Sequence, residues 1–93
     1  MKLKLLLFKD SDCDNCKLIQ EEFIDNPPKC DVIIIHAKHN YNKELLDKYE
    51  IKVFPTSILI DEDLDIKIDT FEGFVDSEFI DHYIKEYETK RLV

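Results

Sequence analysis

Two cysteines separated by two residues carry the clearest chemistry in this sequence: Cys13-Asp14-Asn15-Cys16. A CxxC pair is typical either of thiol redox chemistry or of a metal site. The chain has three cysteines, an odd number, whereas an extracellular scaffold held by disulfides would have an even and denser set. We therefore expect a reducing compartment, the cytoplasm, and take the CxxC pair as the main indication of function.

Composition and charge exclude several other functions. The 93 residues are 44% hydrophobic and 37% charged, which predicts one soluble globular domain over residues 1–93. The net charge of −8 argues against nucleic acid or an anionic membrane as the partner. A single glycine rules out a Gly-rich phosphate loop, and the apolar run at 5–8 is too short for a signal peptide or a membrane span.

The first half of the chain predicts a strand, a helix and a second strand. The nearly continuous apolar run over 2–8 indicates a buried strand, and helical spacing of apolar residues begins at Cys13. Asn26-Pro27-Pro28 ends that helix, because proline cannot continue it. The segment 31–36, with the apolar run Val32–Ile35, predicts a second buried strand, and the whole unit should be a parallel, right-handed βαβ.

The second half predicts four further elements: a helix over 43–50 capped by Asn42, strands over 57–60 and 65–71, and a last helix capped by Asp76 or Ser77. The order βαβ–α–ββ–α predicts a four-stranded mixed sheet flanked by three helices.

Three segments, taken together and in this order, resemble the thioredoxin family in its small form, which lacks an extra N-terminal strand and helix. They are Phe8 through Cys16, Ile51-Lys52-Val53-Phe54-Pro55-Thr56, and Phe71-Glu72-Gly73-Phe74 followed by a capped helix. The resemblance implies a minimal thioredoxin fold, of the α/β class. The chain departs from the family pattern between the cysteines, and Leu7 stands where thioredoxins often bury an acidic residue.

The resemblance also implies roles for both cysteines. Cys13, at a helix N-terminus, would be the nucleophile, and the more buried Cys16 would resolve the mixed disulfide. The protein would cycle between dithiol and disulfide, with the Cys13–Cys16 disulfide as its only redox group and no metal. Electrons would come from a thioredoxin-reductase-like protein or from glutathione, and the substrates would be protein disulfides.

The family pattern further implies a substrate-binding set next to the cysteines, formed by Asp12, Phe54, Pro55, Thr56 and Phe74. Pro55 is expected to be cis, which places the Phe54 main chain beside the CxxC; the alternative is a trans proline that opens the third strand. Phe54 could equally be a core residue, and Phe74 could pack against the last helix.

The surroundings of Cys13 are acidic. Asp10, Asp12 and Asp14 would oppose the helix N-terminus and raise the pKa of the Cys13 thiol, unless all three carboxylates point into solvent and are screened. We expect a monomer, while dimers through Cys30 or through the edge of the strand over 65–71 remain open. Cys30 itself is interpreted as a half-buried thiol, with a regulatory role as the alternative.

Two other function classes remain as alternatives. One is a zinc module that uses Cys13, Cys16, Cys30 and His36, although a second cysteine pair is missing. The other is a thioredoxin-fold interaction module that holds a partner in the Phe54–Pro55 groove without general redox activity.

Overall fold

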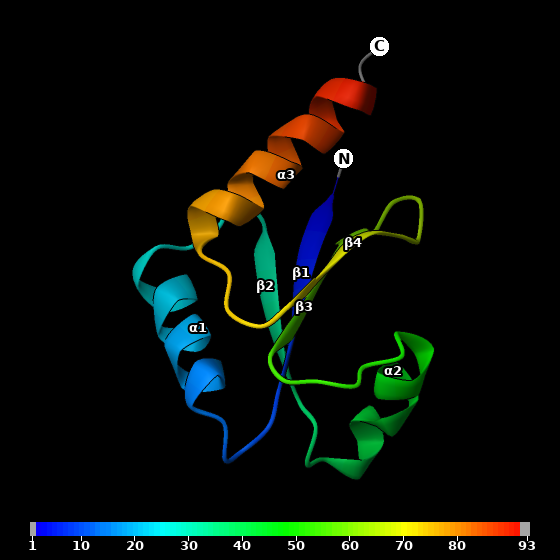
Figure 1. Cartoon of the computed structure of the whole chain (residues 1–93). Helices are drawn as coiled ribbons and strands as arrows, with labels where there is room; N and C mark the ends of the chain where they lie inside the picture. Colours follow the sequence, from blue (N-terminus) through cyan, green and yellow to red (C-terminus); the bar gives the residue numbers. More distant parts are fainter. Residues whose placement is uncertain (1, 92–93) are drawn as a thin grey trace.

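The structure, a computed structural model, describes residues 2–91 and confirms the predicted order of elements (Figure 1). The elements are β1 Leu3–Lys9, α1 Asp14–Asp25, β2 Asp31–His36, the short 3-10 helix η1 Asn40–Asn42, α2 Lys43–Lys48, β3 Thr56–Asp61, β4 Ile66–Glu72 and α3 Ser77–Arg91. Within the described part of the chain, no helix is long and apolar enough to cross a membrane.

The four strands form one mixed sheet in the order β2-β1-β3-β4. β1 pairs in parallel with β2 and antiparallel with β3, and β3 pairs antiparallel with β4. Helices α1 and α3 lie on one side of this sheet and α2 on the other (Figure 1). The parallel β1–α1–β2 unit therefore brings the start of α1 to the C-terminal end of β1, where the cysteines lie.

Alternating side chains of the central strand β1 face two separate apolar clusters, because successive residues of a strand point to opposite faces. Leu5 and Leu7 are fully buried in the cluster on the α1 and α3 face, which also contains Ile19. Leu6 and Phe8 belong to the cluster on the α2 face. The continuous apolar run of β1 is thus explained by helices on both faces of the sheet.

The prediction that the second strand is buried is wrong for most of its residues. Ile33 is 40% exposed and Ile34 is 44% exposed, whereas only Ile35 of this strand is buried. The physical reason is the position of β2 at the edge of the sheet, where it has a partner strand on one side only. An apolar run of this length does not reveal whether its strand is central or at an edge.

The helix ends follow the predicted signals in two of three cases. α1 ends at Asp25, just before Asn26-Pro27, and the Asp76 carboxylate accepts a hydrogen bond from the Phe79 N–H (2.8 Å) at the start of α3. Asn42, predicted to cap the helix over 43–50, makes no such side-chain bond. Its amide instead donates to the His36 carbonyl (2.9 Å), so it holds the loop after β2.

Candidate functional site: the Cys13–Cys16 disulfide

Cys13 and Cys16 form a disulfide at the N-terminus of α1. Cys13 is the N-cap residue of that helix, with extended backbone angles, and the Cys16 N–H points to the Cys13 sulfur at 3.2 Å. Unpaired N–H groups and the helix dipole at this end favour negative charge. When the disulfide is reduced, the same N–H is placed to stabilise a Cys13 thiolate.

The two sulfurs differ in access. Cys13 is partly exposed, whereas Cys16 lies one turn into the helix and is 2% exposed. A molecule that approaches from solvent therefore reaches Cys13 first. Cys16 can react with Cys13 but is shielded from other partners.

The loop before β3 reaches the same place. The Phe54–Pro55 peptide bond is cis, and the Phe54 carbonyl oxygen lies 3.6 Å from the Cys13 sulfur. The Gly73 N–H, just after β4, donates to the Pro55 carbonyl (2.8 Å). Gly73 has a φ of 84°, a conformation that favours glycine. Three segments distant in sequence thus meet at one end of the sheet.

The structure places the five predicted substrate-binding residues in different environments. Asp12 is exposed, and Phe74 is 48% exposed and does not join the buried clusters of the described chain. The Phe54 ring packs against the α2-side cluster, so only its carbonyl faces Cys13. Pro55 is buried.

Of the residues around the cis proline, Thr56 is buried and Val53 is exposed. The Thr56 side chain is 2% exposed, and its hydroxyl donates to the Val53 carbonyl (2.7 Å), which closes the turn around the cis proline. Any contact of Thr56 with a substrate would therefore use its main chain. Val53 is 46% exposed next to this turn, and sequence reasoning missed it. The available signal was an apolar residue in a loop outside any strand pattern.

The position on β1 where thioredoxins often bury an acidic residue holds Leu7. Leu7 is fully buried there, and Asp61, the buried acid of the described chain, lies at the opposite end of β3. Gln20 lies one helical turn after Cys16, and its side-chain oxygen accepts a hydrogen bond from the Lys9 ammonium. Lys9 and Gln20 thus form a part-buried contact between an ammonium and an amide one turn after Cys16.

Ser57 lies opposite Leu7 in the β1–β3 register and gives a stability prediction. It is fully buried, and its hydroxyl has no hydrogen-bond partner among the described residues. A buried hydroxyl without a partner is unfavourable, so Ser57→Ala is expected to raise the free energy of unfolding by about 1 kcal/mol. Urea denaturation measures the change.

Thr56→Val is the matched control for this prediction, because it removes the neighbouring hydroxyl that does have a partner. It should lower the free energy of unfolding by about 1 kcal/mol. If Ser57→Ala lowered the free energy of unfolding as much as Thr56→Val does, the Ser57 hydroxyl would have a hydrogen-bond partner and the prediction would be wrong.

The aspartates near Cys13 all reach solvent. Asp10, Asp12 and Asp14 are exposed, and the Asp10 carboxylate accepts a hydrogen bond from the Ser11 N–H (2.8 Å). An exposed carboxylate about 6 Å from a thiolate, in water-like surroundings, is expected to change the thiolate fraction about 3-fold. Asp12→Asn and Asp14→Asn should therefore each increase alkylation of reduced Cys13 at neutral pH by about 3-fold.

The alkylated peptide, identified by mass spectrometry, gives the rate for each cysteine separately. Asp25→Asn is the control, since Asp25 is an exposed acid at the far end of the same helix. If Cys13 of Asp12→Asn and Asp14→Asn were alkylated at the same rate as in Asp25→Asn, solvent would screen these carboxylates completely.

The four residues of the zinc alternative do not come together. Cys30 precedes β2 and His36 ends it, so the length of the strand separates them, and Cys13 and Cys16 are joined to each other. Burial, followed by the nearby Asp81 and Asp31, raises the pKa of the Cys30 thiol to about 11. Cys30 is therefore protonated and poorly nucleophilic at neutral pH.

Solved thioredoxins and thioredoxin-like proteins have a similar fold. A thioredoxin-like protein from Clostridium perfringens superposes with a TM-score of 0.76 and 19% identity, over 91% of this chain and 70% of that chain. Thioredoxin from Trypanosoma brucei brucei superposes with a TM-score of 0.76 and 16% identity, over 95% of this chain and 76% of that chain. Fasciola hepatica thioredoxin superposes with a TM-score of 0.71 and 20% identity, over 90% of this chain and 80% of that chain. No protein-family model and no curated protein matches the chain. The chain has the thioredoxin fold, with its CxxC pair joined as a disulfide at the start of α1.

Proposed function

We propose that this protein is a thiol–disulfide oxidoreductase that reduces disulfides of other proteins in the cytoplasm. The observation that supports this most strongly is the arrangement of the two sulfurs. Cys13 is accessible at a helix N-terminus, and the buried Cys16 is bonded to it. An exposed attacking thiol and a shielded resolving thiol are what a two-step exchange requires.

In the first step the Cys13 thiolate attacks one sulfur of the substrate disulfide. The substrate S–S bond breaks, its other sulfur leaves as a thiolate and takes a proton, and Cys13 is left in a mixed disulfide. Cys16 then loses its proton and attacks the Cys13 sulfur. This releases the second substrate thiol and leaves the Cys13–Cys16 disulfide, which is the state in the structure.

A donor of two electrons must then reduce that disulfide again. A thioredoxin-reductase-like protein, or two molecules of glutathione, would supply them by the same exchange chemistry.

The loop around Pro55 would hold the substrate. With its oxygen 3.6 Å from the Cys13 sulfur, the Phe54 carbonyl can accept a hydrogen bond from the main chain of an extended substrate segment. Two exposed apolar residues could contact the substrate: Val53, which precedes Phe54, and Phe74, which follows Gly73. Asp12, exposed beside Cys13, would contribute charge selectivity.

Reduction of insulin disulfides by dithiothreitol tests the proposal. The wild type should accelerate the reaction, and Cys13→Ser should not. Circular dichroism must show that both proteins are folded. If neither accelerates the reaction although both are folded, general reductase activity is excluded and the interaction-module alternative gains support. In that case, binding of a partner should survive in the Cys13→Ser, Cys16→Ser double variant.

A further inference from the structure

The two edge strands of the sheet differ in how they are protected against pairing with another strand. An exposed edge offers unpaired N–H and C=O groups, and proteins protect such edges with charges, prolines or bulges. β4 has this protection: Lys67 and Asp69 lie within it, and its pairing with β3 is interrupted between Leu59 and Ile60. The centre of β2, Val32–Ile35, contains neither a charge nor a proline.

The side to which the N–H and C=O groups of each β2 residue point can be assigned from the end of the strand. The Ala37 N–H donates to the Lys9 carbonyl of β1 (2.9 Å). Because main-chain groups of successive strand residues point to opposite sides, Ile35 and Ile33 also face β1, whereas Val32, Ile34 and His36 face outward. The contact of the His36 carbonyl with Asn42 agrees with this assignment.

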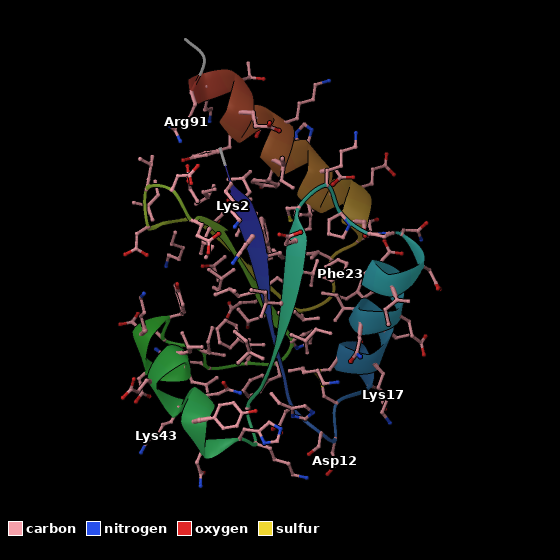
Figure 2. All side chains as sticks on the ribbon, turned by 180° about the vertical axis from the view of Figure 1, so that it is seen from behind. Lys2, Asp12, Lys17, Phe23, Lys43 and Arg91 are labelled. Carbon is pink, nitrogen blue, oxygen red and sulfur yellow. A yellow bond between two sulfur atoms is a disulfide. The ribbon has the colours of Figure 1, made fainter. Side chains whose placement is uncertain are left out.

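The outward groups of β2 divide into free and occupied ones. The His36 carbonyl accepts hydrogen bonds from the Asn42 amide (2.9 Å) and from the His39 N–H (3.3 Å). The N–H and C=O groups of Val32 and Ile34 make no such contact within the described residues. In Figure 2, β2 is the strand nearest the viewer, with α1 to one side and α2 to the other.

We propose that this edge pairs with β2 of a second copy of the chain, antiparallel and centred on Ile33. In this register Val32 of one copy lies opposite Ile34 of the other, and each such pair exchanges both main-chain hydrogen bonds. The outward N–H and C=O groups of Val32 and Ile34 are then all used. A register centred on Ile34 would instead place Val32 opposite His36, whose carbonyl is already occupied.

Side chains and charges also suit a second copy. The two Ile33 side chains, each 40% exposed, would meet on one face, and Val32 would meet the 44% exposed Ile34 on the other. Antiparallel pairing brings the acidic start of one strand, Asp31, beside the end of the other that leads into His36 and Lys38. The disulfides lie toward opposite ends of the joined sheet, so both stay accessible.

Sedimentation equilibrium from micromolar to millimolar concentration tests this pairing. The buffer contains a reductant, to exclude a Cys30 disulfide, and about 0.15 M salt, which shortens the range of repulsion between the acidic chains to about 8 Å. The wild type should approach twice its 11.1 kDa mass as its concentration rises. Ile33→Lys should weaken the dimer by at least about 10-fold, because it places two like charges opposite each other.

Two further variants distinguish the loss of β2 pairing from an effect of added charge elsewhere or of unfolding. Ile66→Lys makes the same change at a 45% exposed isoleucine on the other edge strand and should dimerise like the wild type. Ile34→Pro removes an outward N–H, which an edge strand tolerates, and should prevent the dimer while circular dichroism remains native. In the wild-type dimer, amide exchange at Val32 and Ile34 should slow with concentration, whereas that at Ile33 and Ile35 should not change.

A wild type that remains at 11.1 kDa up to millimolar concentration would overturn the proposal. Equal weakening by Ile33→Lys and Ile66→Lys, or a dimer that forms only without reductant, would overturn it as well.

Discussion

The Cys16→Ser variant is expected to remain covalently joined to its substrate through Cys13, and its turnover should fall by about 1,000-fold. Cys16 is 2% exposed and is held within bonding distance of Cys13, so its attack on the mixed disulfide is intramolecular. An external thiol at millimolar concentration cannot replace such an effective concentration. Non-reducing electrophoresis of the variant after incubation with insulin should show the adduct, and dithiothreitol should release it.

Cys30→Ser is the matched control, because it makes the same chemical change at a thiol that takes no part in the exchange. The raised pKa of Cys30, about 11, keeps that sulfur protonated. This variant should form no lasting adduct and should turn over like the wild type. If Cys16→Ser instead kept most of the activity, the second half of the reaction would be carried out by an external thiol such as glutathione, and the dithiol mechanism would be wrong.

The parts of the site that could be predicted from sequence are those set by local chemistry. The spacing of Cys13 and Cys16 and the polar loop before them place both sulfurs in the first turn of a helix. The contact between the Phe54 carbonyl and the Cys13 sulfur depends on how residues 41 positions apart are brought together. That contact could be expected only from the family resemblance, because no local pattern in the sequence encodes it.

The errors in the fold have the same origin. Val32–Ile35 looks like a buried central strand, but burial depends on which strands lie beside it, and β2 has only β1. Asn42 has the residue type of a helix cap, but its side-chain amide donates a hydrogen bond to the His36 carbonyl instead. Both cases are decided by tertiary neighbours, which periodicity and residue type do not specify.

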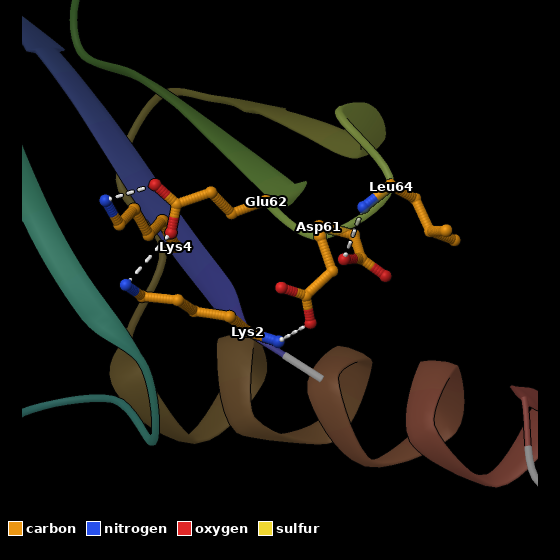
Figure 3. A network of polar contacts seen from close by, with 6 residues as sticks. Lys2, Lys4, Asp61, Glu62 and Leu64 are labelled. Carbon is orange, nitrogen blue, oxygen red and sulfur yellow. Dashed lines mark hydrogen bonds and ion pairs between the residues drawn. The ribbon is translucent and has the colours of Figure 1, made fainter.

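The charged C-terminal helix provides a third case. Helical spacing places Tyr87 on the apolar face of α3, whereas Arg91 belongs to a charged stretch that predicts a solvated helix end. The sequence does not show that both side chains reach the fully buried Asp61 at the end of β3. The Tyr87 hydroxyl and an Arg91 guanidinium N–H each donate to Asp61 Oδ2 at 2.7 Å. The Leu64 N–H donates to Oδ1 (3.3 Å), and Figure 3 shows this contact beside the separate ion pairs of Glu62 with Lys2 and Lys4.

These contacts make Asp61 a determinant of stability and of its pH dependence. The Tyr87 hydrogen bond, followed by the Leu64 N–H and Arg91, lowers the pKa of Asp61 below its ordinary value of 3.8, although burial acts in the opposite direction. The unfolded state therefore binds the proton more readily than the folded state. The stabilisation is fully present above about pH 4 and is lost as the pH falls through the lower pKa of the folded protein.

Asp61→Ala is expected to lower the melting temperature at pH 7 by about 10 °C, because it leaves the Tyr87 hydroxyl and Arg91 without their buried acceptor. The difference from the wild type should shrink as the pH falls below about 4 toward the lowered pKa of the folded protein, because the wild-type carboxyl then becomes protonated and loses its charged contacts. Thermal melts from pH 7 to pH 2 measure both effects. Asp65→Asn removes an exposed carboxylate from the neighbouring turn and should follow the wild-type curve. An Asp61→Ala curve that ran parallel to the wild type through this range would mean that packing, not the charged contact, accounts for the loss.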